Sequence, residues 1–173
     1  MKQHIYCKKG IETTHSYPIV ESIFKNICDF IELNETSDLL NKTHIHGATS
    51  TEIQNILNIK LETLGFTSEK KGLFKQYISS NLRPDFFKKI SENDGIIVEV
   101  ERGKTLDNNM NLLDIWKCHI CKDANYLFLI IPEFKTNQKG SKQKIFDRTI
   151  NRLASFFEED NYINVDAVFI LGY

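Results

Sequence analysis

The sequence predicts a mixed α/β domain in which a central sheet is flanked by helices. Two observations carry this prediction. Segments with apolar side chains at helical spacing alternate with short apolar runs, and one of these runs, Tyr126 to Ile131, is apolar throughout, as in a strand that is buried on both faces. The length of 173 residues fits one domain. We expect residues 1–48 to form a helical extension and residues 49–173 to form the core.

The N-terminal part of the chain is predicted to be helical. Residues 17–33 have an apolar stripe at helical spacing, and Pro18 is tolerated in the first turn of a helix. The segment Asn34 to Ala48 is polar, and we expect it to be irregular. A second helix begins near Thr49, whose spacing to Glu52 fits a capping box, and ends at Gly65.

Three consecutive strands are predicted in the middle of the chain. They cover Leu73 to Ser79, Arg83 to Lys89 and Ile96 to Arg102. A short turn, Glu92 to Gly95, joins the last two, which favours antiparallel pairing.

The C-terminal half is predicted to alternate between helices and strands. Its elements are a helix from Leu106 to Cys121, the strand Tyr126 to Ile131, a polar loop from Lys135 to Ser141, a helix from about Lys142 to Glu158 and a strand from Asp166 to Leu171. In the first of these helices, four apolar residues are expected to face inward: Leu112, Leu113, Trp116 and Ile120. Right-handed crossovers would make the later strands parallel, with helices on both faces of the sheet.

Two acidic residues interrupt the most apolar part of the predicted sheet. Ile97, Glu99 and Glu101 point to one face of their strand, because side chains alternate along a strand. Two like charges on a mostly buried face cost several kcal/mol unless a cation lies between them. The pair therefore indicates a divalent metal site, although it could also be the solvent-exposed face of an amphipathic strand.

Asp85 is a third carboxylate that the turn can bring to the same place. It follows Pro84, which cannot donate to a strand ladder and marks a strand start or a bulge. A hairpin-like connection can place Asp85 and Glu99 on neighbouring strands. Two such carboxylates, a backbone carbonyl and waters suit Mg²⁺. Taken alone, Asp85 would be an ordinary aspartate at the end of a strand.

The order Pro84-Asp85, thirteen residues, and Glu99-x-Glu101 resembles the PD-(D/E)xK nuclease superfamily, with glutamate in place of the final lysine. The predicted element order also resembles the αβββαβ core of that superfamily, and BamHI-like type II restriction endonucleases have a Glu-x-Glu form. The resemblance implies a restriction-endonuclease-like fold and a metal-dependent DNA endonuclease. Asp85 and Glu99 would hold Mg²⁺, for which Mn²⁺ could substitute, and Glu101 would orient or deprotonate the attacking water.

The resemblance also implies two further catalytic residues. An acidic residue on the helix before the three strands recurs in the superfamily as an extra ligand, and Glu52 has that position. Its place in the capping box is an equally good explanation. Some members carry the missing lysine on another element, where Lys117 is the candidate; alternatively, Lys117 is an exposed helix lysine.

Basic residues could contact the phosphates of double-stranded DNA, the implied substrate. Lys144, Arg148 and Arg152 recur every four residues on one helix face, and Lys88 lies nearer the acidic residues in the sequence. Such a ridge can bind phosphates or can simply be solvated. Cleavage of both strands at a palindromic site would require a homodimer, since the target then has two-fold symmetry.

Composition restricts these possibilities only in part. The net charge of −1 neither favours nor excludes a nucleic-acid partner. There is no apolar run of about 18 residues and no signal-like start, so we expect a cytoplasmic protein without a membrane partner. A repair or recombination nuclease, a phage-defence nuclease of the same fold, and a non-catalytic interaction domain are the alternatives to a restriction enzyme.

Overall fold

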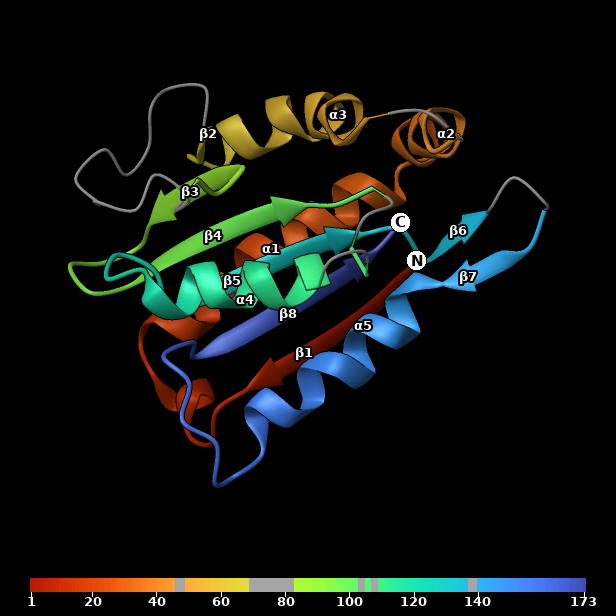
Figure 1. Ribbon diagram of the computed structural model, residues 1–173. Coiled ribbons are helices and arrows are strands. Elements are labelled where there is room, and N and C mark those ends of the chain that lie inside the picture. Colours follow the sequence, from red (N-terminus) through yellow and green to blue (C-terminus); the bar gives the residue numbers. More distant parts are fainter. Residues whose placement is uncertain (46–48, 69–82, 103–104, 107–108, 137–139) are drawn as a thin grey trace.

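A six-stranded mixed sheet forms the centre of the molecule (Figure 1). The computed structural model describes residues 1–45, 49–68, 83–102, 105–106, 109–136 and 140–173. The strands are β1 (Lys2–Cys7), β2 (Thr67–Ser68), β3 (Phe86–Lys89), β4 (Gly95–Val100), β5 (Tyr126–Ile131) and β8 (Ala167–Gly172). Their order across the sheet is β1-β8-β5-β4-β3-β2. The strand predicted from Leu73 to Ser79 lies outside the described residues.

The three middle strands are parallel and completely buried. β4 pairs with β5, and β5 with β8, in parallel. Every residue of these strands is buried, as expected where helices cover both faces of a sheet. Their C-terminal ends lie at one edge of the sheet, which we call the carboxyl edge. β1, β3 and β2 are added antiparallel on the two sides.

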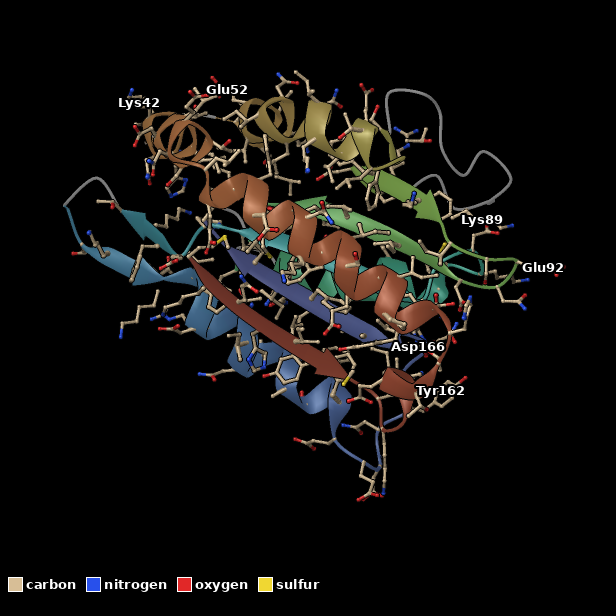
Figure 2. The ribbon with its side chains drawn as sticks, turned by 180° about the vertical axis from the view of Figure 1, so that it is seen from behind. Lys42, Glu52, Lys89, Glu92, Tyr162 and Asp166 are labelled. Atoms are coloured by element: carbon tan, nitrogen blue, oxygen red, sulfur yellow. The ribbon has the colours of Figure 1, made fainter. Side chains whose placement is uncertain are left out.

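One face of the sheet is covered by α1 (Ser16–Glu32), α2 (Asn34–Thr43) and α3 (Ser50–Thr63). α1 crosses the sheet, as Figure 2 shows from behind, and buries Val20, Phe24 and Ile27 against it. The ring of Phe24 lies 5.3 Å from that of Phe128 and 5.0 Å from that of Phe169. This packing explains the apolar stripe in the sequence and confirms the first predicted helix.

The other face is covered by α4 (Met110–Ile120) and α5 (Ile145–Leu153), followed by a 3-10 helix, Ala154–Phe157. Alternate residues of the strands supply the two cores: Ile96 and Val98 contact the α1 side, and Ile97 the α4 side. The protein is therefore a mixed α/β fold with three layers, in agreement with the prediction. None of the helices in the described residues has the length and apolar character needed to span a bilayer.

Three segments differ from the prediction. Residues 34–43, expected to be irregular, form α2, whose few apolar residues include the buried Leu40. Residues 2–7 form β1, so the helical extension predicted for residues 1–48 also contains a strand of the central sheet. In both segments tertiary contacts supply the stability that weak apolar patterning did not indicate.

The third difference is a two-stranded ribbon where a polar loop was expected. β6 (Phe134–Thr136) and β7 (Lys142–Lys144) pair antiparallel and are separate from the central sheet. The ribbon projects from the carboxyl edge beside both chain ends (Figure 1). The helix predicted from Lys142 is correspondingly shorter and begins at Ile145.

Candidate functional site

Glu99 is a carboxylate in the buried centre of the sheet. It has 3% of its surface exposed, while Ile97 and Val98 have 0%. The strand alternation directs Glu99 to the same face as Ile97, toward α4. This exposure removes the alternative that Glu99 belongs to a solvent-exposed strand face.

Lys117 of α4 is the direct partner of Glu99. Its Nζ atom lies 2.9 Å from Oε1 of Glu99 and 3.2 Å from Oδ1 of Asp114. The Lys117 side chain is only 20% exposed, so the alternative of an exposed helix lysine does not hold. The structure therefore joins Glu99 to the lysine that lies eighteen residues farther along the chain.

Asp114 was missed by the sequence reasoning because α4 is turned differently from the prediction. Leu113, Trp116 and Ile120 were expected to point inward but are 46%, 56% and 41% exposed. The buried residues of α4 are Asn111, Asp114, Ile115 and Cys118. The polar residues Asn111, Asp114 and Lys117 recur at intervals of three on the helix, and this polar stripe was the signal that could have revealed the site.

Asp85 lies next to this group from the neighbouring strand. It directly precedes β3, and the pairing of Phe86 with Val98 places Asp85 opposite Glu99 in the continued register. Oδ2 of Asp85 accepts a hydrogen bond of 2.8 Å from the backbone N–H of Val100. The carboxylate is near enough to affect the titration of both Glu99 and Asp114. We call Asp85, Glu99, Asp114 and Lys117 the acidic cluster.

Carboxyl groups outnumber cations in the acidic cluster. Burial raises the pKa of Glu99 well above its usual range, Asp114 and Asp85 raise it further, and Lys117 opposes them. Burial also raises the pKa of Asp114, to about 6. For Lys117, burial lowers the pKa, but the attraction of Glu99 and Asp114 outweighs it and the net shift is upward. One ammonium thus faces three carboxyl groups, a surplus that a bound cation would relieve.

Several polar atoms are buried without a hydrogen-bond partner in the described part of the protein, and one belongs to the acidic cluster. That atom is Oδ2 of Asp114, and three others belong to residues with 0% exposure: Oγ1 of Thr105, Nδ2 of Asn111 and Oγ1 of Thr149. Unpartnered buried polar groups cost roughly 1–3 kcal/mol each. Oδ2 of Asp114 is thus an acceptor that a cation or a water molecule could satisfy.

The carboxylates fit Mg²⁺ in number, although the structure does not form a complete protein cage. Within the described residues, no three His, Cys, Asp or Glu side chains are grouped as metal ligands. Mg²⁺ commonly uses only one or two protein carboxylates and completes its octahedron with water and substrate phosphate oxygens. Asp85 and Glu99, on neighbouring strands, can supply such a pair.

Glu101 follows the end of β4 and continues its hydrogen-bond ladder. Its N–H donates to the carbonyl of Ile130 at 2.8 Å, and its own carbonyl accepts from the Tyr173 hydroxyl at 3.0 Å. Strand alternation places it on the same face as Glu99, and it is half-buried. Its suggested role with the attacking water stays a prediction.

Glu52 lies on α3, in the layer on the opposite side of the sheet from α4, and is exposed (Figure 2). Its Oε2 accepts hydrogen bonds from the Thr49 N–H at 2.6 Å and from the Thr49 hydroxyl at 3.1 Å. The capping box that the sequence indicated is therefore formed. The catalytic role of Glu52 stays a prediction.

The four basic candidates differ in the contacts that they make. Nζ of Lys88 donates to the carbonyl of Leu64 at 2.7 Å and so satisfies the C-terminal end of α3. Arg152 donates to Asn111 at 3.2 Å and to Asn109 at 3.1 Å, which ties α5 to the beginning of α4. Arg148 and Lys144 are exposed, and Lys144 belongs to the ribbon rather than to the helix.

No protein-family model and no curated protein matches this chain. The residues of the acidic cluster, with their contacts and charges, are the basis for assigning a function.

Proposed function

We propose that this protein is a Mg²⁺-dependent DNA endonuclease and that the acidic cluster is its active site. The observation that carries the proposal is the convergence of Asp85, Glu99 and Lys117 from three separate elements, with Glu99 buried at the centre of the sheet. A purely structural role would not require two buried carboxyl groups, Glu99 and Asp114, around one lysine, since apolar side chains of similar volume are often as stable or more stable.

The chain's own residues have distinct roles in this proposal. Asp85 and Glu99 would hold the metal, which would supply a water molecule of lowered pKa and polarise the scissile phosphate. Lys117 lies 2.9 Å from Glu99, close enough to orient that carboxylate and to interact with a phosphate oxygen or the attacking water. Glu101, which follows the end of β4 and lies on the same face as Glu99, is the candidate base.

The resemblance to the PD-(D/E)xK superfamily supports the same proposal. The described elements from α3 to β5 follow the order αβββαβ, with Asp85 and Glu99 on neighbouring strands. Lys117 supplies, from α4, the lysine that the Glu-x-Glu sequence lacks. Specifically, we propose a type II restriction endonuclease that acts as a homodimer on double-stranded DNA in the cytoplasm. Mn²⁺ could substitute for Mg²⁺.

Cleavage of plasmid and genomic DNA by the purified chain tests the proposal. We expect cleavage with Mg²⁺ or Mn²⁺ but not with EDTA. Glu99→Gln, which keeps the shape of the side chain but removes its charge, should lower the rate at least 100-fold while the circular dichroism spectrum stays unchanged. Glu35→Gln, at an exposed position on α2, is the matched control and should cleave normally.

The products separate the restriction role from its alternatives. Discrete fragments would support restriction, whereas nicking confined to branched or flapped substrates would indicate a repair or recombination nuclease. Equal cleavage by wild type and Glu99→Gln, or no cleavage of any substrate, would refute the proposal and leave a non-catalytic interaction domain. Sedimentation at several protein concentrations tests the homodimer.

A further inference from the structure

The exposed face of the ribbon formed by β6 and β7 carries positive charge. The register pairs Phe134 with Lys144 and Thr136 with Lys142. Facing residues of an antiparallel pair lie on the same side of the ribbon, so these four side chains share one face, and all four are exposed. We call Phe134, Thr136, Lys142 and Lys144 the ribbon face. The opposite face, with Lys135 and Gln143, is half-buried.

The charge of the ribbon contrasts with that of the whole chain. Its described residues, 134–136 and 140–144, contain three lysines and no acidic residue, whereas the chain has a net charge of −1. In the described part of the protein, neither Lys142 nor Lys144 is within 4 Å of a carboxylate oxygen. The nearby Asp147 is bound by Lys2 at 2.6 Å. The ribbon face is therefore complementary to a polyanion.

The base of the ribbon is held in place by three other parts of the fold. Nε2 of His44, at the end of α2, lies 2.8 Å from the carbonyl oxygen of Phe134. Lys2, at the start of β1, lies over the Phe134 ring at 5.9 Å. The N–H of Ile145, the first residue of α5, donates to the carbonyl of Glu133 at 3.0 Å. A ribbon fixed in this way is preorganised for binding.

Direct contacts connect this base to the strand of the acidic cluster. The N–H of Glu133 donates to the carbonyl of Tyr173 at 2.8 Å, and the hydroxyl of Tyr173 donates to the carbonyl of Glu101 at 3.0 Å. The ribbon and the end of β4 therefore lie at the same carboxyl edge (Figure 1). A polyanion bound by the ribbon would be held at the carboxyl edge, where Glu101 follows the end of β4.

We propose that the ribbon inserts into the major groove of duplex DNA, with Lys142 and Lys144 contacting phosphates. This inference rests on the proposed nuclease function. The major groove is about 12 Å wide and admits a two-stranded β-ribbon. Single strands, by contrast, are bound mainly by stacking bases on several aromatic side chains, and the ribbon face has only Phe134. Duplex DNA is therefore the occupant that the ribbon fits best.

Binding of a 30-base-pair duplex, measured by fluorescence anisotropy in EDTA at several salt concentrations, tests the inference. Each lost phosphate contact makes the negative slope of log affinity against log salt less steep by about 0.9. The double variant Lys142→Ala with Lys144→Ala should therefore have a slope that is less steep by about 1.8. Extrapolated from 1 M salt, this corresponds to roughly 60-fold weaker binding at 0.1 M. Lys142→Arg with Lys144→Arg should restore the slope.

The matched control is Lys25→Ala with Lys89→Ala, two exposed lysines on α1 and β3. Figure 2 shows Lys89 at the opposite end of the molecule. The control should bind within about twofold of wild type. An unchanged slope and affinity in the Lys142 and Lys144 double variant would overturn the inference, as would equal competition by single-stranded DNA.

Cleavage measured in parallel separates the inference from the proposed function. Wild-type protein that binds the duplex through the ribbon but shows no Mg²⁺-dependent cleavage would refute the nuclease and retain the ribbon. If cleavage depends on Glu99 but the Lys142 and Lys144 double variant binds duplex normally, the nuclease function is retained and the role of the ribbon is refuted. No binding of duplex by the wild type would remove the inference.

Discussion

Asp114→Asn is expected to make the protein more stable at neutral pH. Asp114 is completely buried, and its pKa is raised from 3.8 to about 6, chiefly by burial. Because the folded-state pKa exceeds the unfolded-state value, the neutral carboxyl favours folding below about pH 4, and this contribution is lost as the pH rises through about 6. A difference of about 2 between the pKa values corresponds to about 3 kcal/mol. Asparagine resembles the neutral carboxyl and does not lose this contribution.

Urea unfolding of both proteins between pH 4 and pH 8 measures the effect. The unfolding free energies should be similar near pH 4 and should diverge through pH 6, with the variant ahead by up to about 3 kcal/mol at pH 8. Asp29→Asn, at an exposed position on α1, should differ from wild type by less than about 0.5 kcal/mol throughout. A variant that is less stable than wild type at pH 8, or a difference that does not vary with pH, would refute the reasoning.

Three further predictions concern the same structure. Lys117→Met leaves Glu99 and Asp114 without their cation, so it should lower the unfolding free energy by about 3–5 kcal/mol at pH 8. The loss should be smaller at pH 5, where the carboxyl groups take up protons. Urea unfolding measures this loss, and a loss no larger than that of Lys25→Met, at an exposed position, would contradict the prediction. Glu52→Gln preserves the reciprocal capping of Thr49, so thermal unfolding should be unchanged. DNA cleavage then decides the role of Glu52: a 100-fold slower rate would establish it as catalytic, and a normal rate would leave it the capping role alone. Gly95→Ala would bring a methyl group against the backbone oxygen of Asp123 and within 2.7 Å of the Phe87 ring, and should destabilise by about 1–3 kcal/mol. In Gly172→Ala the nearest atoms to the added methyl group belong to side chains, which can shift, so the loss of unfolding free energy should be smaller than in Gly95→Ala. Equal losses in urea unfolding would show that the backbone clash at Gly95 is not the cause.

Much of the fold follows from local patterns in the sequence. The apolar stripe of α1, the capping box of α3 and the apolar run of β5 each give an element where it was predicted. Burial of a strand or a helix face requires apolar residues at a fixed period, so these elements can be read without tertiary information. The alternation along β4 likewise directed Glu99 away from Val98 and Val100.

Elements with weak local patterns were missed. α2 buries only Thr36 and Leu40, and β1 has half-buried residues at most, so neither presents a strong apolar period. The ribbon of β6 and β7 has only three residues in each strand and a polar composition. Such short elements are stabilised by their contacts with the rest of the molecule rather than by their own sequence.

The sequence by itself determined the α/β class, the strand that carries Glu99 and the pairing of that strand with the one after Asp85. The tertiary structure decided the rotation of α4. Its sequence offers an apolar face with Leu113 and Trp116 and a mixed face with Asp114 and Ile115, and the periodicity alone favoured the first. Burying Lys117 on the second face is favourable because Glu99 of β4 pairs with it at 2.9 Å and Asp114 at 3.2 Å. The carboxylate of Glu99 on β4 thus determines which face of α4 is buried, through a contact with Lys117, eighteen residues farther along the chain. A local sequence pattern contains no information about such a contact.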